Sequence, residues 1–350
     1  MKSITKTFKK IGSSYRIKKI LRQADKLHKT STELITTGRI KEELPVFDTI
    51  KFKEKTERLK DTVFKTKVLD FIENGYVVIE NSVSQHLIDE AVKEFYSWKA
   101  RNKKHFVYTF FRYDDKLDRI INIQATLPVF KDLFYENKAL EIQDYLFQKK
   151  TCLWTSLLFE VGSSQSIHRD EPVFWTKPAH NYFGTWLALE DTDATNGPLM
   201  VIPGSHKLNP ALIDKLKIVK QKYSDLKKIK KIDDELWNIY QSEIEELCYA
   251  SGLKIKEVYV KKGDTIIWHP LLAHGGAHIK DVSKTRLSYI VHTIPYNTPV
   301  YGMDVFFNPE KRVKQKTTFK YESRNSRSIT MHDQLTIGHK VNNFDFSILK

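Results

Sequence analysis

The fold is decided by residues 261–276, KKGDTIIWHPLLAHGG, taken together with residues 167–170, IHRD. The run DTIIW (264–268) predicts a short buried strand, and His274 follows six residues after its end. Gly275 and Gly276 come next, and glycines at this place would let the backbone come close to a metal-bound side chain. His274 is therefore a candidate metal ligand close to the end of a strand.

Other short apolar runs lie on both sides of this segment. They are residues 76–79, 153–161, 183–190, 199–202, 257–261 and 286–294, and most are bounded by glycine, proline, asparagine or aspartate. Short strands with such turns predict an antiparallel sandwich or barrel. Helical spacing of apolar residues predicts helices after the N-cap Ser84, over 138–149 and within a lysine-rich insertion, residues 207–256.

His168 and Asp170 are two residues apart, so in an extended segment their side chains point to the same face. A distant histidine would complete a set of two imidazoles and one carboxylate. This set leaves three positions open on an octahedral ion and suits non-haem Fe(II). His274 is the predicted third ligand, and His269 is the alternative.

Arg286 begins the strand predicted over 286–294, and Ser288 shares its face. A guanidinium fork beside a hydroxyl is suited to bidentate binding of a carboxylate. The distal carboxylate of 2-oxoglutarate would fit there, while its keto-acid end would take two of the open metal positions. Arg286 and Ser288 are therefore the predicted cosubstrate-binding residues.

Composition excludes several classes of protein. The 350 residues are 41% apolar, which is enough for a full core, and no run approaches the ~18 apolar residues of a membrane-spanning helix. The N-terminus lacks the apolar region of a secretory signal. Two cysteines cannot build a disulfide framework or a cysteine zinc cluster. We therefore expect a cytoplasmic protein.

The net charge of +15 is concentrated at the two ends. Residues 1–30 carry +9 and residues 311–350 carry +6, so residues 31–310 are neutral overall. A neutral body argues against nucleic-acid binding, which needs a basic groove. Residues 1–30 also carry an apolar stripe at helical spacing. Three interpretations stay open: a helix docked on the body, a helix in peripheral contact with a membrane, and an organelle presequence.

Several of these runs resemble the phytanoyl-CoA dioxygenase family. The matching runs are IHRD (167–170), NGPLMVIPGSH (196–206), KKGDTIIWHPLLAHGG (261–276), TRLS (285–288) and, for the N-terminal portion, ENGYVVIENSVSQHLIDEAV (73–92). The resemblance covers about residues 67–295. It implies a mainly β protein with flanking helices and a double-stranded β-helix, or jelly-roll, core. It also implies a reaction that uses Fe(II), 2-oxoglutarate and O2, mostly to hydroxylate small molecules.

The resemblance carries roles onto matching positions. His168, Asp170 and His274 match the metal ligands, Arg286 and Ser288 match the 2-oxoglutarate site, and Trp186 looks like a wall of the cosubstrate pocket. The chain departs from the family at Ala277-His278, where many members have a more polar turn. We predict a basic helical arm at 1–66, a dioxygenase domain at 67–299 that contains the 207–256 insertion, and a basic C-terminal extension at 300–350.

The substrate is less constrained. Phe174, Trp175, His180 and Tyr182 follow Asp170 and are candidates for the substrate mouth, with plain packing as the alternative, and Arg112 is a candidate for gripping an anion. No role is predicted for His292. We predict a hydroxylase of a small-molecule or lipid/glycan substrate that releases succinate and CO2, and acyl-CoA, amino acid, sugar and lipid-linked glycan substrates all stay open. The rivals are a jelly-roll binding protein without turnover and a nucleic-acid-directed oxygenase. The oligomeric state stays open.

Overall fold

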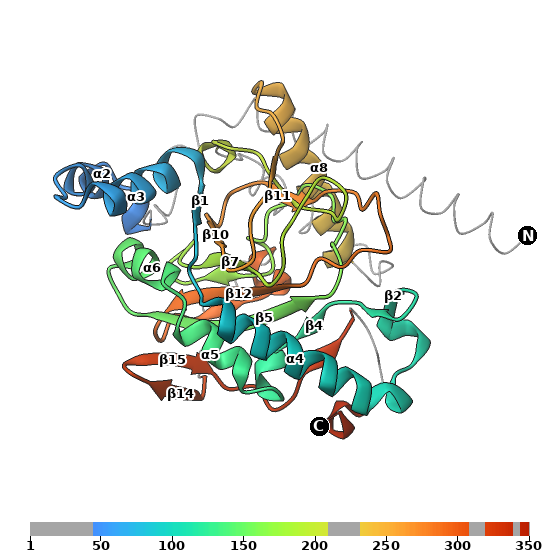
Figure 1. Cartoon of the computed structure of the whole chain (residues 1–350). Helices are drawn as coiled ribbons and strands as arrows, with labels where there is room; N and C mark the ends of the chain where they lie inside the picture. Colours follow the sequence, from blue (N-terminus) through green and yellow to red (C-terminus); the bar gives the residue numbers. More distant parts are fainter. Residues whose placement is uncertain (1–44, 209–231, 308–318, 339–343, 350) are drawn as a thin grey trace, which may run out of the picture.

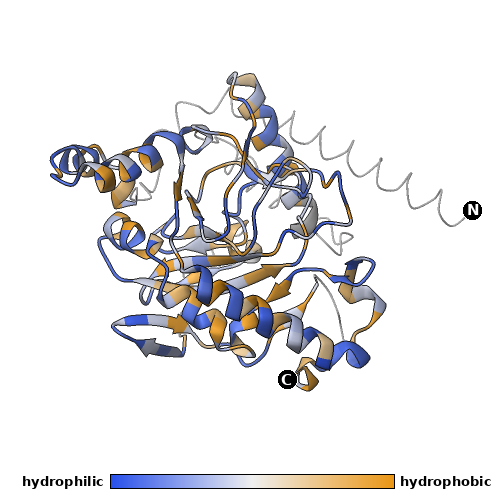
Figure 2. Ribbon diagram, viewed as in Figure 1, coloured by the Kyte–Doolittle hydropathy of each residue, from blue (hydrophilic) through white to orange (hydrophobic). Residues whose placement is uncertain are grey.

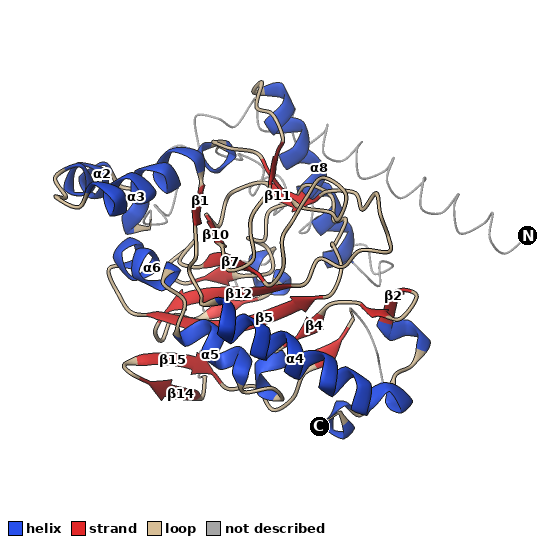
Figure 3. Ribbon diagram, in the orientation of Figure 1, coloured by secondary structure: helices blue, strands red, loops and turns tan. Residues whose placement is uncertain are grey.

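A nine-stranded, mostly antiparallel sheet forms the centre of the protein (Figure 1, Figure 3). The computed structural model describes residues 45–208, 232–307, 319–338 and 344–349. The sheet order is β1 (Tyr76–Ile79), β10 (Thr265–Trp268), β7 (Phe183–Ala188), β12 (Ser288–Pro295), β5 (Thr151–Phe159), β15 (Arg327–Thr330) and β14 (Tyr321–Arg324). Off this path, β4 (Ile120–Ile121) pairs with β5 and with β16 (Thr336–Ile337).

The two faces of this sheet are covered differently. Along β12, Tyr289 and Val291 belong to a core shared with helices α4 (Gln85–Asn102) and α5 (Val129–Tyr135). Ile290, between them, belongs to a second core that includes Trp186 and residues of a smaller sheet. This alternation is the two-residue period of a strand that is buried on both faces. Figure 2 shows these strands largely in orange, with blue and orange mixed along α4.

The smaller sheet has the order β11 (His274–Gly276), β8 (Leu199–Val201) and β9 (Lys256–Val258). Leu199 and Val201 of β8 pack in the same cluster as Ile266 and Trp268 of β10. Two sheets therefore enclose an interior, as the predicted jelly-roll core requires, which confirms the predicted fold class. Two short ladders complete the strands: β2 (Phe111–Tyr113) with β3 (Lys116–Leu117), and β6 (Trp175–Thr176) with β13 (Val300–Tyr301).

The helices begin and end where local sequence dictates. The Ser84 hydroxyl accepts a hydrogen bond from Leu87 N and caps α4, as predicted. Helix α3 (Thr62–Asn74) ends at Gly75, which has a φ of +78°, a region that favours glycine. The other helices are α2 (Ile50–Glu57), α6 (Ala139–Phe147), α8 (Ile232–Ala250) and α9 (Met303–Phe306), with single 3-10 turns at Val46–Asp48, Lys103–His105, Tyr108–Phe110, Ile123–Ala125, Ser205–Lys207 and Phe346–Ile348.

The predicted segments outside the central domain are partly integrated into it. Phe47 and Phe52, in the predicted arm, are buried in one cluster with Phe71 and Phe183, and α3 runs across the predicted boundary at residue 66. In the predicted C-terminal extension, β15 pairs with β5 in parallel. The apolar stripe of residues 1–30 and the first half of the insertion, 209–231, lie outside the described residues. Within the described part of the chain, no helix is long and apolar enough to cross a membrane.

Candidate metal centre and cosubstrate pocket

Backbone hydrogen bonds hold His168 and His274 opposite each other. His168 N donates to His274 O (2.8 Å) and His274 N donates to His168 O (2.9 Å), which makes an isolated antiparallel bridge. Gly275 allows this approach, because a Cβ there would lie 2.6 Å from the backbone oxygen of Gln165. The centres of the two imidazole rings lie 4.5 Å apart. Glycine at position 275 therefore permits a close approach of two backbone segments beside the candidate ligands.

Both imidazoles present the same nitrogen to a common point. Nδ1 of His168 lies 2.8 Å from Ser166 O, and Nδ1 of His274 lies 2.9 Å from Leu272 O. A carbonyl only accepts, so each Nδ1 carries the proton and each Nε2 keeps its lone pair for a metal. Each Nε2 is 3.4 Å from a carboxylate oxygen of Asp170.

His168, Asp170 and His274 therefore form a possible metal site. One ligand atom from each residue lies within 4.8 Å of the other two. Two imidazole nitrogens and one carboxylate, with the remaining directions open to a cavity, suit Fe(II). The alternative ligand His269 is engaged elsewhere, because its Nε2 lies 3.0 Å from Asp48 Oδ1 and its Nδ1 accepts from Leu271 N.

Asp170 carries a negative charge in this setting. Burial raises the pKa of its carboxyl, but the electrostatic attraction of His274 and the close side-chain contacts of His168, His274 and His292 outweigh burial, so the pKa lies well below its usual value. His292 Nε2 is 3.2 Å from Asp170 Oδ2, although no role was predicted for this histidine. The sequence contained a signal for it, because His292 follows Ser288 and Ile290 at strand spacing and so shares their face.

The triad opens onto a cavity of ≈ 580 Å³ inside the jelly-roll. Its lining comes from both sheets and from two helices. The polar or aromatic members beyond the triad are Arg119, Ser163, Gln165, Phe174, Trp186, Trp237, Asn238, Trp268, Arg286 and His292. The volume lies in the usual range for small-molecule sites, about 300–1,000 Å³.

Arg286 lies in the wall of this cavity and is only 2% exposed. Its Nη1 donates to Gly197 O (3.0 Å), while its Nε has no hydrogen-bond partner among the described residues. The guanidinium stands 5.3 Å from the ring centre of Trp186, which also lines the cavity. Burial lowers the pKa of Arg286 to about 10, so the side chain stays charged at neutral pH. A buried cation with an unused donor fits a carboxylate.

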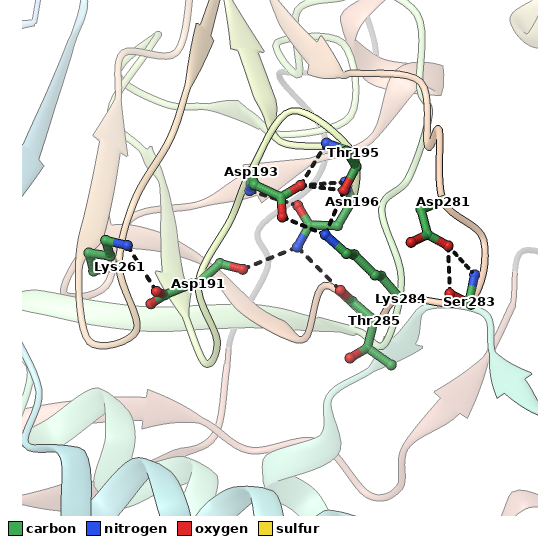
Figure 4. A network of polar contacts seen from close by, with 9 residues as sticks. All are labelled: Asp191, Asp193, Thr195, Asn196, Lys261, Asp281, Ser283, Lys284 and Thr285. Atoms are coloured by element: carbon green, nitrogen blue, oxygen red, sulfur yellow. Dashed lines mark hydrogen bonds and ion pairs between the residues drawn. The ribbon is translucent and has the colours of Figure 1, made fainter.

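A polar network outside the cavity orders the loop before Arg286 (Figure 4). The Asp193 carboxylate accepts a hydrogen bond from Lys284 Nζ (2.7 Å), and Asn196 Nδ2 donates to Thr285 O (3.3 Å). These contacts tie residues 191–196 to residues 281–285, immediately before Gly197 and Arg286. They therefore help to place Gly197 O, which accepts a hydrogen bond from the Arg286 guanidinium.

The other predicted site residues occupy different places. Ser288 is fully buried, and its Oγ has no hydrogen-bond partner among the described residues, but Ser288 is not in the cavity lining. Phe174 lines the cavity, with its ring 3.8 Å from that of His292. The remaining candidates are held outside the lining.

Each of these has a packing or polar partner. Trp175 packs on Phe306 (5.1 Å between ring centres). His180 Nε2 lies 2.6 Å from Glu171 Oε1. Tyr182 is buried and donates to Pro270 O (3.0 Å), and Arg112 donates to Ser163 O and pairs with Asp118. The structure brings Arg119, not Arg112, into the wall of the cavity.

Comparison with known proteins gives the family. The phytanoyl-CoA dioxygenase (PhyH) family model matches residues 71–280. The phytanoyl-CoA dioxygenase domain-containing protein 1 homolog of Caenorhabditis briggsae is 23% identical over 198 residues, which are 55% of this chain and 64% of that protein. Peroxisomal phytanoyl-CoA dioxygenase of Bos taurus is 29% identical over 124 residues, 34% of this chain and 30% of that protein. The chain thus spans less than two thirds of the length of both relatives.

A solved structure shares the fold. The non-heme alpha ketoglutarate dependent carbocyclase SnoK from nogalamycin biosynthesis aligns with a TM-score of 0.50 at 16% identity, over 73% of this chain and 92% of that chain. The family match covers more than half of the sequence and includes all three triad residues. The protein therefore belongs to the phytanoyl-CoA dioxygenase (PhyH) family of Fe(II)- and 2-oxoglutarate-dependent oxygenases.

Proposed function

We propose that this protein hydroxylates a small molecule with Fe(II), 2-oxoglutarate and O2, and releases succinate and CO2. The observation that carries the proposal is that His168, Asp170 and His274 face the same cavity as Arg286. A metal site alone would also suit a binding protein. A buried arginine in the same cavity adds the group needed to hold a dicarboxylate cosubstrate.

The residues have distinct roles in this reaction. Iron, when bound, supplies the redox chemistry that couples O2 to decarboxylation of the cosubstrate and oxidation of the substrate. His168 and His274 offer Nε2 because their Nδ1 protons are held by carbonyls, and Asp170 adds the negative charge. Arg286 binds the distal carboxylate of 2-oxoglutarate, with Trp186 packed against the guanidinium. The apolar walls of both sheets keep bulk water away from the reacting groups.

Succinate release tests this proposal. The purified protein should convert 2-oxoglutarate to succinate in the presence of Fe(II) and O2, slowly even when no substrate is added. His168→Ala should abolish this turnover, because it removes one of three ligands. His278→Ala is the matched control, since His278 is an exposed histidine four residues after His274. Full succinate release by His168→Ala, or none by the unaltered protein, would contradict the proposal, and the second result would favour a binding protein.

The cavity volume restricts the substrate. With 2-oxoglutarate bound, ≈ 580 Å³ leaves room for a small molecule or for one end of a larger one. A lipid-linked glycan would fit if only its reacting sugar entered the cavity. Such a substrate would place the protein at a membrane surface. The basic residues and the apolar stripe of residues 1–30 would supply the contact. Each basic residue near an anionic leaflet contributes about 1 kcal/mol at most, enough for reversible binding.

Liposome flotation tests the membrane contact. The full chain should float with anionic vesicles at low salt and be released at high salt, because the attraction is screened within a Debye length. A chain that begins at Ser31 should stay at the bottom of the gradient at both salt concentrations. A full chain that does not float at low salt would show that the basic ends serve another purpose.

A further inference from the structure

Helix α8, in the second half of the insertion, packs against both segments that carry the metal ligands. Its buried side chains Leu236, Tyr240 and Ile244 share one core cluster with Ile167 and Ala273. These two residues directly precede His168 and His274 in the sequence. Figure 1 shows α8 in gold beside β11. The insertion therefore shares a core with the residues that precede two of the candidate ligands.

The three ligands differ in how their backbone is held. His168 and His274 fix each other through their backbone bridge. Asp170 lies two residues beyond this bridge, where the chain turns, and its carbonyl accepts from Val173 N and Phe174 N. His292 contacts its carboxylate, but the backbone of Asp170 needs a support other than the bridge.

A single side chain of α8 supplies the hydrogen bonds that a neighbouring strand would give. Arg169 N donates to Gln241 Oε1 (2.8 Å), and Gln241 Nε2 donates to Arg169 O (2.9 Å). The second bond fixes the peptide unit that leads into Asp170. Gln241 is only 8% exposed, so little water competes for either bond.

The residue after Asp170 is held by the same helix. Tyr240 donates a 2.5 Å hydrogen bond to Glu171 Oε2, and His180 contacts the other oxygen of that carboxylate. On the other side, the fully buried Arg169 donates from Nη2 to Ser205 O (2.6 Å). Alternation along the segment turns Arg169 and Glu171 away from the face that His168 and Asp170 share.

We propose that α8 is a positioning element of the metal site, in which Gln241 and Tyr240 hold Asp170 at the distance from His168 and His274 that a common ion requires. The inference rests on the proposed iron site. It assigns the insertion a part in metal binding, through residues that do not touch the ion. Partners of this kind change metal affinity by about 10–100-fold when they are removed.

Co(II) binding tests the proposal without turnover. The titration uses the full chain and follows both the dissociation constant and the visible spectrum of bound Co(II). Gln241→Leu removes both hydrogen bonds at nearly constant size, and it should weaken Co(II) binding about 10–100-fold and alter the spectrum. Tyr240→Phe removes only the hydroxyl, and it should cause a smaller loss in the same direction.

Gln143→Leu is the matched control. Gln143 is also a buried glutamine with two side-chain hydrogen bonds, to Thr185 (2.8 Å) and Thr293 (2.7 Å), but it does not contact the ligand segments. Both leucine variants should lower the melting temperature by comparable amounts, while Gln143→Leu keeps Co(II) affinity within about two-fold.

The outcomes separate this inference from the proposed function. Failure of the unaltered protein to bind Co(II) at a site that His168→Ala removes would overturn the metal site itself, and the inference with it. With that site present, unchanged affinity in Gln241→Leu would overturn only the positioning role. Equal losses in both leucine variants would also overturn it, because general destabilisation would then explain the effect. If Gln241→Leu fails to fold, unchanged affinity in Tyr240→Phe decides against the inference.

Discussion

Replacing Arg286 should weaken 2-oxoglutarate binding and leave metal binding intact. Arg286→Gln removes the positive charge but retains a donor that reaches toward Gly197 O, the present partner of Nη1. Arg286→Lys keeps the charge but offers a single ammonium in place of the planar fork. The two variants therefore separate the contribution of charge from that of bidentate geometry.

The size of the effect follows from burial. Arg286 is 2% exposed, so its bond to a carboxylate is little screened by solvent. A hydrogen bond to a charged group contributes about 1.5–3 kcal/mol, and each 1.4 kcal/mol is about ten-fold in affinity. We expect a loss of roughly ten-fold to 150-fold for Arg286→Gln. Arg286→Lys should lie between this variant and the unaltered protein.

The assay is an anaerobic titration of 2-oxoglutarate into the Fe(II)-loaded protein. Pyruvate provides a ligand control, because it has the keto-acid end without the distal carboxylate, and its affinity should not change in either variant. Unchanged 2-oxoglutarate affinity in Arg286→Gln would refute the assignment. A loss in Arg119→Gln instead would move the carboxylate site to the other arginine that lines the cavity.

Two further predictions concern the metal ligands. Gly275→Ala should lower the free energy of unfolding by about 1–3 kcal/mol and weaken metal binding, because the new Cβ would lie 2.6 Å from the backbone oxygen of Gln165. Unchanged thermal unfolding of this variant would show that the segment near Gln165 moves aside. Turnover in chloride buffer should give only oxygenated products, since the Asp170 carboxylate would take the ligand position that a halide would need. A chlorinated product in the mass spectrum would contradict this role of Asp170.

The candidate metal ligands could be predicted because their arrangement depends on short-range geometry. His168 and Asp170 share a face through two-residue spacing, and the structure brings them together with His274 as expected. Seven strands were predicted to within three residues at either end, since β-branched runs and turn residues mark them locally, whereas β11 and the strands after residue 300 were not predicted. Their ends shifted where a tertiary contact, such as the pairing of β12 with β7, determines the last hydrogen bond.

The residues around the substrate could not be predicted in the same way. The chain turns directly after Asp170, so alternation no longer tells which aromatic side chain faces the cavity, and Phe174 does while Trp175 packs on Phe306. Arg119 enters the lining beside β4, a strand of two residues that is too short to leave a pattern in the sequence. Only the tertiary packing of α8 shows that Trp237 faces the cavity.

The bridge between His168 and His274 links metal binding to folding. These histidines are 106 positions apart in the sequence, so their pairing exists only after a long loop of chain has closed. Closing such a loop reduces the conformational entropy of the chain, and this loss opposes folding. An ion that binds only the closed pair adds stability by mass action, about 2.7 kcal/mol at one hundred times its dissociation constant. Iron would thus stabilise the pairing of the two ligand segments as well as serve as a reaction centre, and iron limitation would weaken the fold where these segments meet.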